Sequence, residues 1–540
     1  MRIALAQINP TLADFKTNKE KILDYIKQAQ QKKCELVVFP ECTLFGYHPF
    51  DLLERSKIVQ KQEAEMKDLI KKIPAGIGVI FGVITENSAK KGRPYFNSAV
   101  FAAKGQKPRF FHKQLLPTGD VFDEARFIEA GDMSKNFFKW KGKKFFLTIC
   151  EDIWAWPDAK GHSPYKVNPL AQVKKQKIDM VVNLSASPFF VGKMKMREYV
   201  AGQTAKHFGA PIMYANLVGA QDEIIFDGAS FVLDKKGKKI LSCQSFAEDL
   251  NVLDLDTLES WNKTTKLTAI EEMRQALVLG IRDFCEKTGL KKIHLGLSGG
   301  IDSAVVAALA VDALGPSHVT GIGLPGPFNS PKSLSLAKEL AKNLAIDFKV
   351  VEIGPMYDQV VKSLEGSLGL KEFGLVHENL QARLRGLTLM AYSNKENSLL
   401  LTTSNKSEYA SGYSTLYGDM CGGLAPLGDL TKAQVYELAR YYNKQGEVIP
   451  AEIIDRPPSA ELRPNQKDQD SLPPYEDLDK SVVYLVEKSG VAKTATDKWL
   501  LPLLMRTEFK RWQAPPILKV SEHSFGRGRR YPVAHKAREL

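Results

Sequence analysis

The chain has 540 residues, which is too long for one hydrophobic core and allows two to four domains of roughly 100–200 residues each. Its composition, 44% hydrophobic and 25% charged, is that of a globular protein and excludes disorder of the whole chain. The net charge of +13 would suit a polyanionic partner, but the lysines are spread along the chain, so we expect no nucleic-acid partner.

The amino terminus is an amphipathic strand without the apolar core of a signal peptide. No uncharged apolar run approaches the ~18 residues of a membrane span, so we expect a cytoplasmic protein with no membrane partner. The six cysteines form no C-x-x-C pair, which predicts mostly buried free thiols rather than disulfides or a zinc site. They stand at positions 34, 42, 150, 243, 285 and 421.

The first half of the chain is rich in short apolar runs, and helical spacing, as in residues 18–31, alternates with the early ones. This alternation predicts an α/β domain. The expected strands cover residues 2–8, 35–40, 78–85, 97–102, 145–150, 180–184, 211–216 and 230–233.

Three reactive side chains, Glu41, Lys113 and Cys150, stand at or just past the ends of apolar runs, where α/β enzymes place their chemistry. A thiol can attack an amide carbon, a carboxylate can carry the thiol proton to the leaving ammonia, and a lysine can stabilise the oxyanion. Each residue taken singly has a plainer interpretation. A cysteine that closes an apolar strand is usually a core residue, and a lysine or glutamate after a strand is usually solvated.

The motifs around these residues, in this order and spacing, resemble the nitrilase (carbon–nitrogen hydrolase) superfamily. They are Val-Val-Phe-Pro-Glu, His-Lys-Gln-Leu-Leu-Pro, Phe-Asp-Glu and Thr-Ile-Cys-Glu-Asp-Ile-Trp. The resemblance implies an α-β-β-α sandwich over residues 1–262, with Glu41 as base, Lys113 as oxyanion stabiliser and Cys150 as nucleophile. Residues 183–189 and 192–193 resemble the stretch that contacts glutamine in glutaminase members, which implies that Ser187 and Lys193 bind glutamine.

The chain departs from the family pattern just before Phe-Asp-Glu. Members carry Leu-Pro-Asn-Tyr-Gly-Val-Phe-Asp-Glu where this chain has Leu-Pro-Thr-Gly-Asp-Val-Phe-Asp-Glu, so Gly119 replaces a tyrosine that contacts glutamine. Because the three reactive residues remain, we expect a working glutaminase with altered or weaker affinity for glutamine, unless Asp120 or another side chain fills the space.

Residues 254–268 become polar before helical spacing resumes over residues 270–284, and we place the domain boundary there, between residues 262 and 263. Strands and helices then alternate regularly, which predicts a doubly wound parallel sheet with its ligand at the carboxyl ends of the strands. The expected elements are strands at residues 318–324, 348–352 and 398–402 and helices at residues 331–343 and 379–394.

Residues 293–303 read Ile-His-Leu-Gly-Leu-Ser-Gly-Gly-Ile-Asp-Ser and run into an apolar stretch of helical length, residues 304–314. We interpret them as a strand, a glycine turn and a helix whose first N–H groups and dipole face a phosphate. No lysine follows Gly300, so this is not the G-x-x-x-x-G-K-[ST] nucleotide loop, and Asp302 is placed to hold Mg²⁺ on phosphate oxygens. The alternative is an ordinary glycine turn before a buried helix.

The hexapeptide at residues 298–303 resembles the S-G-G-x-D-S loop of the ATP pyrophosphatases, which split ATP into AMP and pyrophosphate while adenylating a substrate. Four further motifs make residues 263–540 similar to ammonia-dependent NAD synthetase domains, with an adenine nucleotide alpha hydrolase-like fold. They are His-Glu-Asn-Leu-Gln-Ala-Arg, Thr-Thr-Ser-Asn-Lys-Ser-Glu, Tyr-Gly-Asp-Met-Cys-Gly-Gly and Glu-Phe-Lys-Arg. The entire chain thus resembles the family of glutamine-dependent NAD synthetases.

That resemblance implies ATP-dependent amidation of deamido-NAD to NAD through an adenylated intermediate, with ammonia from glutamine and with Mg²⁺ as cofactor. The residues implied for ATP are Gly296, Leu297, Ser298, Gly299, Gly300, Ile301, Asp302, Ser303, Thr403, Lys432 and Ser459. Asn379, Glu408 and Lys510 are implied for deamido-NAD, and Asp302 and Glu408 for the metal. The small-molecule substrates are then deamido-NAD, ATP and glutamine, and we expect a homo-oligomer.

Two segments and two other functions stay open at this point. Residues 456–480 are rich in Pro, Asp and Gln and predict a long polar loop, either a lid or a merely mobile segment. Residues 521–540 are basic and irregular, either a frayed tail or an oligomer contact. The other functions are a different ATP pyrophosphatase, such as a tRNA-modifying enzyme, and a binding protein that keeps two degenerate enzyme folds.

Overall fold

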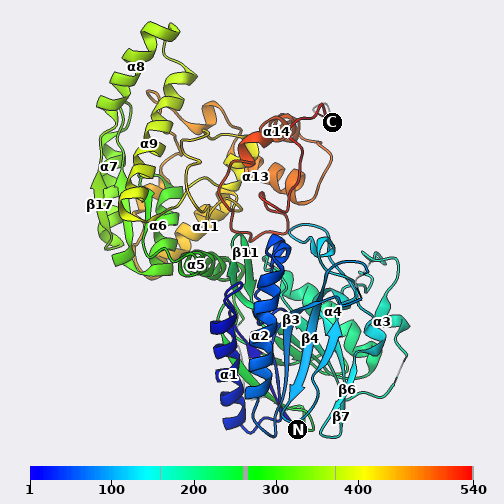
Figure 1. The fold of residues 1–540 in the computed structure, drawn as a ribbon. Coiled ribbons are helices and arrows are strands. Elements are labelled where there is room, and N and C mark those ends of the chain that lie inside the picture. Colours follow the sequence, from blue (N-terminus) through cyan, green and yellow to red (C-terminus); the bar gives the residue numbers. More distant parts are fainter. Residues whose placement is uncertain (90, 159, 175, 260–265, 371, 538–540) are drawn as a thin grey trace. The chain divides into compact units, whose positions relative to one another are not determined.

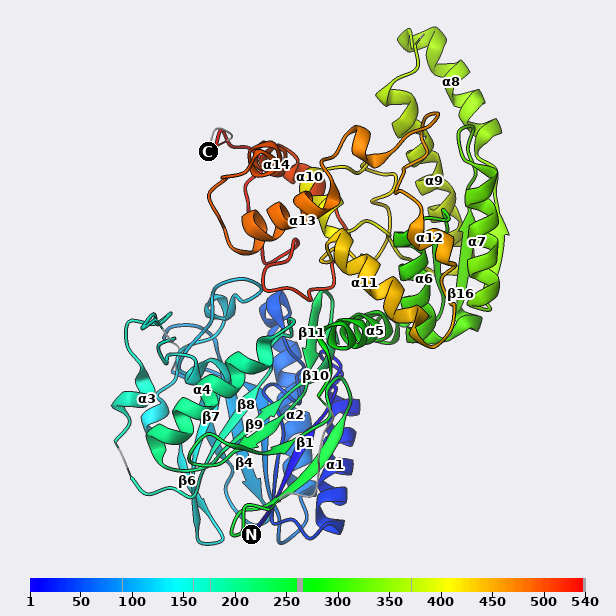
Figure 2. The same cartoon turned by 180° about the vertical axis from the view of Figure 1, so that it is seen from behind.

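The computed structural model describes residues 1–537 apart from positions 90, 159, 175, 260–265 and 371. The chain divides into two compact units, Met1–Leu267 and Thr268–Leu540 (Figures 1 and 2). The predicted boundary between residues 262 and 263 lies outside the described residues.

The first unit is built on two six-stranded sheets. One sheet has the order β14 (Asp249–Asp254), β1 (Arg2–Gln7), β2 (Leu36–Val38), β3 (Gly78–Glu86), β4 (Tyr95–Ala103), β5 (Arg109–His112). The other has the order β13 (Lys239–Ser242), β12 (Phe231–Leu233), β9 (Ile212–Asn216), β8 (Met180–Ser185), β7 (Lys143–Ile149), β6 (Phe137–Trp140). A separate hairpin pairs β10 (Val218–Gln221) with β11 (Ile224–Asp227).

The two sheets share one core, and helices cover their outer faces. Leu5 and Val38 of the first sheet lie in the same apolar cluster as Leu147 and Val182 of the second. Helices α1 (Phe15–Gln31) and α2 (Ser56–Lys72) pack on the first sheet, and α3 (Pro169–Gln172) and α4 (Lys193–Phe208) pack on the second. These four layers confirm the predicted α-β-β-α sandwich.

Helix α1 shows how the sequence specifies a layer. Its buried positions, which include Phe15, Ile22, Ile26 and Ala29, follow helical spacing and therefore form one apolar face. The Asp14 carboxylate accepts a hydrogen bond from the Thr17 N–H at 3.3 Å and so caps the first turn. The apolar face then buries itself against the sheet, while the polar face meets water.

The second unit contains a four-stranded parallel sheet of order β17 (Asp347–Val350), β16 (Val319–Gly323), β15 (Ile293–Gly296), β18 (Leu399–Leu400). Chain order reverses between β15 and β18, which is the switch point where doubly wound sheets bind ligands. Helices α6 (Ile301–Leu314) and α9 (Leu375–Glu396) both pack against β15. The predicted doubly wound fold is confirmed.

The unit has further α-helices besides these two. They are α5 (Ala269–Thr288), α7 (Pro331–Asn343), α8 (Gly354–Leu368), α10 (Lys406–Ser411), α11 (Lys432–Tyr442), α12 (Ala451–Asp455), α13 (Tyr475–Val482), α14 (Ala495–Arg506) and α15 (Glu508–Arg511).

The structure corrects two predictions about irregular segments. Residues 456–480 are not one loop, because α13 begins at Tyr475: Pro474 is a favourable residue at a helix start, and Glu476 and Asp477 complement the dipole of its first turn. The segment from residue 521 is not wholly frayed, because the Phe525 side chain is buried in the unit's own core, and an oligomer contact by this segment stays a prediction. The prediction for the cysteines is confirmed, since all six are free and five are buried.

Candidate active sites

The three reactive residues predicted for the first unit lie at or shortly past the ends of its strands. Glu41 lies three residues past β2, Lys113 directly follows β5, and Cys150 directly follows β7. The Lys113 ammonium donates to Glu41 Oε1 at 2.9 Å and to Glu124 Oε1 at 2.7 Å. Asn97 also donates to Glu41 Oε1, at 2.7 Å, so the carboxylate has a fixed orientation. The lysine is therefore held between two carboxylates and cannot swing away.

Burial sets the protonation of this group. It disfavours the Lys113 ammonium, but the charges of Glu124 and Glu41 outweigh it and raise the pKa of Lys113 well above its ordinary value. Burial also raises the pKa of Cys150 well above its ordinary value, and the charge of Glu41 adds to this. The resting pair is thus a neutral thiol beside a carboxylate whose own pKa burial raises, which suits proton transfer from sulfur to oxygen.

The backbone at Cys150 is strained and supported by a neighbouring aspartate. Cys150 has a φ of 43° and opens a 3₁₀ turn, Cys150–Ile153. The Asp152 carboxylate accepts hydrogen bonds from the N–H groups of Ile149, Gln114 and Leu115, each at 2.9 Å. Asp152 therefore joins the turn that carries the thiol to the segment that follows Lys113.

The predicted glutamine residues lie on neighbouring elements. The Ser187 hydroxyl accepts a hydrogen bond from Nε of the buried Arg197 at 3.0 Å, and Arg197 is paired with Asp227 at 2.7 Å. The Lys193 ammonium lies over the ring of Trp154, 4.3 Å from its centroid. Gly119 is exposed, and a Cβ placed on it would meet no atom within 4 Å.

The second unit holds a cavity of about 290 Å³ at the switch point of its sheet. Ten of the predicted ATP residues line it: Gly296, Leu297, Ser298, Gly300, Ile301, Asp302, Ser303, Thr403, Lys432 and Ser459. Gly299 is not among the described lining residues, but it shapes the turn. Its φ is +78°, and a Cβ would lie 2.2 Å from the Ser333 carbonyl oxygen, so only glycine fits.

Two carboxylates and one ammonium meet at the cavity wall. The Lys432 ammonium donates to Asp302 Oδ2 at 2.5 Å and lies 3.7 Å from Glu408 Oε1. The Asn405 amide donates to Asp302 Oδ1 at 3.0 Å and to Glu408 Oε1 at 2.8 Å, and thereby ties the carboxylates together. Burial and the charge of Asp302 raise the pKa of Glu408 well above its ordinary value. The single ammonium of Lys432 therefore does not balance the charge of both carboxylates.

This arrangement fits a magnesium ion that shares its ligands with a substrate. In the described chain, no group of three or more His, Cys, Asp or Glu side chains could hold a metal by itself. Mg²⁺ usually takes only one or two carboxylates from a protein and completes its shell with phosphates and water. Asp302 and Glu408 match that requirement. The charge of Asp302 contributes to the raised pKa of Glu408, and a divalent cation would offset this repulsion between the two carboxylates.

Two of the residues predicted for deamido-NAD do not line the described cavity. Oδ1 of the Asn379 side chain accepts a hydrogen bond at 2.8 Å from the hydroxyl of Thr415, and Thr415 does line the cavity. The Lys510 ammonium donates to the carbonyls of Gly412 and Ser414 at 2.7 and 2.6 Å. Both side chains therefore support the segment that carries Thr415, whereas the third predicted residue, Glu408, reaches the cavity directly.

Arg385 on α9 is a cavity residue that the sequence did not indicate. Its guanidinium donates to the carbonyl of Leu324 at 3.1 Å and to Asn329 Oδ1 at 2.7 Å, both neutral groups. Burial lowers the pKa of Arg385 to about 10, although the charges of Glu461 and Asp419 act in the opposite direction. It has no ion pair in the described part of the chain. Its place on one face of a mostly polar helix was no signal by itself.

Glu124 is the residue of the first unit whose role the sequence did not indicate. The Phe-Asp-Glu motif contains it, but only the structure shows its hydrogen bonds, one from Lys113 and one at 2.7 Å from the hydroxyl of Tyr47. Its other oxygen has no described partner although it is buried.

Comparisons with known proteins agree with this architecture. The family model for carbon–nitrogen hydrolases matches residues 2–263, and the model for NAD synthase matches residues 273–513. The glutamine-dependent NAD(+) synthetase of Synechocystis sp. is 44% identical, with 98% of each chain covered, and that of Thermotoga maritima is 36% identical, with 100% of this chain and 99% of that one covered. A solved Acinetobacter baumannii glutamine-dependent NAD+ synthetase in complex with ADP is 35% identical, with 98% of each chain covered and a TM-score of 0.76.

The fold and these matches define a class: a carbon–nitrogen hydrolase domain fused to an ATP-dependent synthetase domain. More narrowly, the chain belongs to the family of glutamine-dependent NAD(+) synthetases. In the described residues, no helix is long and apolar enough to cross a membrane.

Proposed function

We propose a division of labour between the two units for the reaction of this family. The chain is a ligase that amidates deamido-NAD to NAD with ATP and with ammonia from glutamine, and its other products are AMP, pyrophosphate and glutamate. Residues of the first unit release the ammonia, and residues of the second unit activate the carboxylate and join it to nitrogen.

In the first unit, the Cys150 sulfur attacks the amide carbon of glutamine while Glu41 takes the thiol proton. Lys113 donates to the oxygen that becomes negative, since Glu41 and Glu124 keep its ammonium charged and in place. Glu41 passes the proton to the departing nitrogen, and water then cleaves the thioester to give glutamate. Ser187, fixed by Arg197, and Lys193 hold the substrate.

In the second unit, the nicotinate carboxylate of deamido-NAD attacks the α-phosphorus of ATP and displaces pyrophosphate. The resulting acyl adenylate is reactive enough for ammonia to displace AMP. Residues 296–303 cradle the phosphates, and Lys432 screens their developing charge. Mg²⁺, held by Asp302 and Glu408, would neutralise phosphate charge.

The observation that carries this assignment is the cluster of Asp302, Glu408 and Lys432 beside a glycine turn at the switch point of the sheet. A bound nucleotide with its metal would suit this arrangement of a glycine turn, two carboxylates that repel each other and a buried ammonium. An ordinary glycine turn before a buried helix would need none of these charges.

The direct test is a product assay with the purified full-length chain, ATP, Mg²⁺, deamido-NAD and glutamine. We expect NAD, AMP, pyrophosphate and glutamate in equal amounts, with ammonium salts replacing glutamine at higher concentration. Omission of Mg²⁺ with a chelator present should stop NAD formation from both nitrogen sources. Absence of NAD with either source would contradict the proposal.

We also propose that the protein works in the cytoplasm as an assembly of identical copies. Six free thiols suit a reducing compartment. Sedimentation of the purified chain would test the assembly, and a monomer at working concentration would contradict it.

A further inference from the structure

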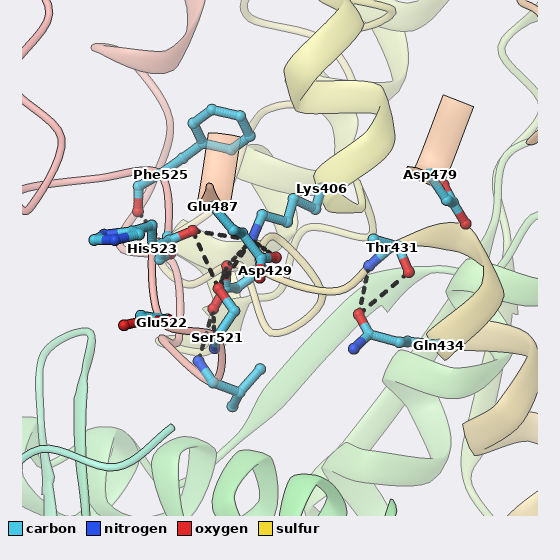
Figure 3. Close-up of polar contacts among 12 residues, drawn as sticks. Lys406, Asp429, Thr431, Gln434, Asp479, Glu487, Ser521, Glu522, His523 and Phe525 are labelled. Atoms are coloured by element: carbon cyan, nitrogen blue, oxygen red, sulfur yellow. Dashed lines mark hydrogen bonds and ion pairs between the residues drawn. The ribbon is translucent and has the colours of Figure 1, made fainter. Parts of the chain in front are cut away.

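A buried polar cluster in the second unit joins the start of α10 to the carboxyl-terminal stretch of the chain (Figure 3). The Lys406 ammonium donates to Glu487 Oε1 at 2.6 Å and to Ser521 Oγ at 2.9 Å. It also donates to the His523 carbonyl at 3.0 Å and forms an ion pair with Asp429 Oδ1 at 3.0 Å. The side chains of Lys406 and Asp429 are fully buried. All three donors of the lysine are therefore used inside the unit.

Asp429 is held as completely as Lys406. Its Oδ2 accepts hydrogen bonds from the N–H groups of Val520 at 2.7 Å and Ser521 at 2.6 Å, and its Oδ1 accepts from the Ser521 hydroxyl at 2.7 Å. Burial raises the pKa of Asp429, but the charges of Lys406 and Lys519 outweigh it, so the pKa lies below its ordinary value. The carboxylate is therefore charged and fixed to residues 520–521.

Both partners of this ion pair lie next to residues of the ATP site. Lys406 is two residues before Glu408 on α10, and Asp429 is three residues before Lys432 at the start of α11. The backbone N–H of Lys406 also donates to the Leu430 carbonyl at 2.8 Å. The start of α10 is thereby fixed against the start of α11, and with it the 3.7 Å separation between Glu408 and Lys432.

Stability alone is a weak reason for such a cluster. Replacing a buried ion pair by apolar side chains is often neutral for stability, and in some proteins such a pair serves to fix one geometry. The Glu487 partner ends a π-helical turn, Val483–Glu487, and such turns are rare and frequent at functional sites.

We propose that Lys406, Asp429 and Ser521, together the carboxyl-terminal clamp, position Glu408 and Lys432 for adenylation, an inference that rests on the proposed function of that cavity. None of the three clamp residues lines the described cavity. They act through the placement of two helix starts, so that a serine about twenty residues from the carboxyl end of the chain controls turnover at the switch point of the sheet.

Ser521→Ala tests the clamp without leaving a buried charge unpaired, because Lys406 and Asp429 still face each other. The substitution removes both hydrogen bonds of the Ser521 hydroxyl within the clamp, one from Lys406 and one to Asp429, and should lower the ammonia-dependent kcat roughly 2- to 10-fold and raise the half-saturating Mg²⁺ concentration. Ser521→Thr keeps the hydroxyl and should restore most of the turnover. Ser524→Ala is the matched control, because among the described residues the Ser524 hydroxyl donates only to the neighbouring Phe525 carbonyl, at 2.8 Å.

The assay is run well below the thermal midpoint of each variant, with glutamine hydrolysis as an internal reference. A Ser521→Ala enzyme with a lowered midpoint but parental kcat and Mg²⁺ dependence would show a purely structural role and overturn the inference. Equal losses in Ser521→Ala and Ser524→Ala would overturn it as well. An inactive parent chain would instead refute the proposed function, so the two failures are distinguishable.

Discussion

Asp302→Asn removes one negative charge from the proposed ATP site and keeps the shape of the side chain. In the parent, Asp302 lies 2.5 Å from the Lys432 ammonium and is joined to Glu408 through the Asn405 amide. Two unit charges ~4 Å apart interact with about 4 kcal/mol at an effective dielectric constant of about 20. The substitution loses one attraction of that size and relieves one repulsion of the same order.

These two terms have opposite signs, so the free energy of unfolding should change by much less than the ~3–5 kcal/mol lost when a buried ion pair is broken without compensation. Catalysis has no such compensation. Loss of one fixed electrostatic group at a reacting centre costs about 10²–10³ in turnover, or ~2.7–4 kcal/mol. Lower negative charge should also raise the Mg²⁺ concentration needed for half-maximal rate.

The assay is ammonia-dependent NAD formation at saturating ammonium, with a Mg²⁺ titration and a thermal melt of each protein. Asp312→Asn is the control, because Asp312 lies on the same helix and takes part in polar contacts with Arg274 and with the Tyr442 hydroxyl, away from the cavity. It should keep parental turnover. If Asp302→Asn retained most of the ammonia-dependent rate, Asp302 would be a structural residue and the metal assignment would be refuted.

Three further predictions concern single positions. Gly119→Tyr has room at its Cβ and should lower the KM for glutamine about 10- to 200-fold if the pocket lacks an aromatic wall; a higher KM with unchanged kcat would show that another group fills the space. Arg385→Met should raise the KM for ATP or deamido-NAD roughly 10- to 100-fold and cost only about 1–3 kcal/mol of stability, because the Leu324 carbonyl loses its hydrogen bond but no described ion pair is broken; an unchanged KM for both would contradict a ligand role. Burial lowers the pKa of His48 to about 4 from 6.5. Between these pH values His48 is protonated in the unfolded chain but neutral in the folded one, so the first unit should lose about 3 kcal/mol of stability as pH falls from 6.5 to 4. The measurement is the urea midpoint of the first unit at each pH, followed by hydrogen exchange of first-unit peptides. His48→Asn should flatten the dependence of this midpoint on pH, and a parental slope would refute the assignment.

The sequence allowed the layers of both units to be predicted because buried strands appear as apolar runs. β8, Met180–Ser185, is fully buried and was recognisable for that reason. The hairpin of β10 and β11 was not, because its turn at Asp222 and Glu223 lacks the glycine or asparagine that marks such turns. Pro474 led us to expect a loop where it precedes a helix, since proline favours both.

The candidate sites likewise contain features that the sequence predicted and features that it did not. Reactive side chains that directly follow strands, such as Lys113 and Cys150, were predictable from their place in the chain and from family motifs. Contacts between distant segments were not. Asn405 joins Asp302 to a residue 106 positions further along, and the clamp joins Lys406 to a serine 115 positions away; no local pattern encodes either pairing.

Cys150→Ala tests most directly whether ammonia release and NAD formation use separate sites. NAD formation by this variant is measured with glutamine and, in parallel, with ammonium salts, at equal ATP, Mg²⁺ and deamido-NAD. The account predicts loss of the glutamine-dependent rate and a largely intact ammonia-dependent rate, because the thiol serves only the cleavage of glutamine. An equal loss with both nitrogen sources, in a variant with a parental thermal melt, would contradict it.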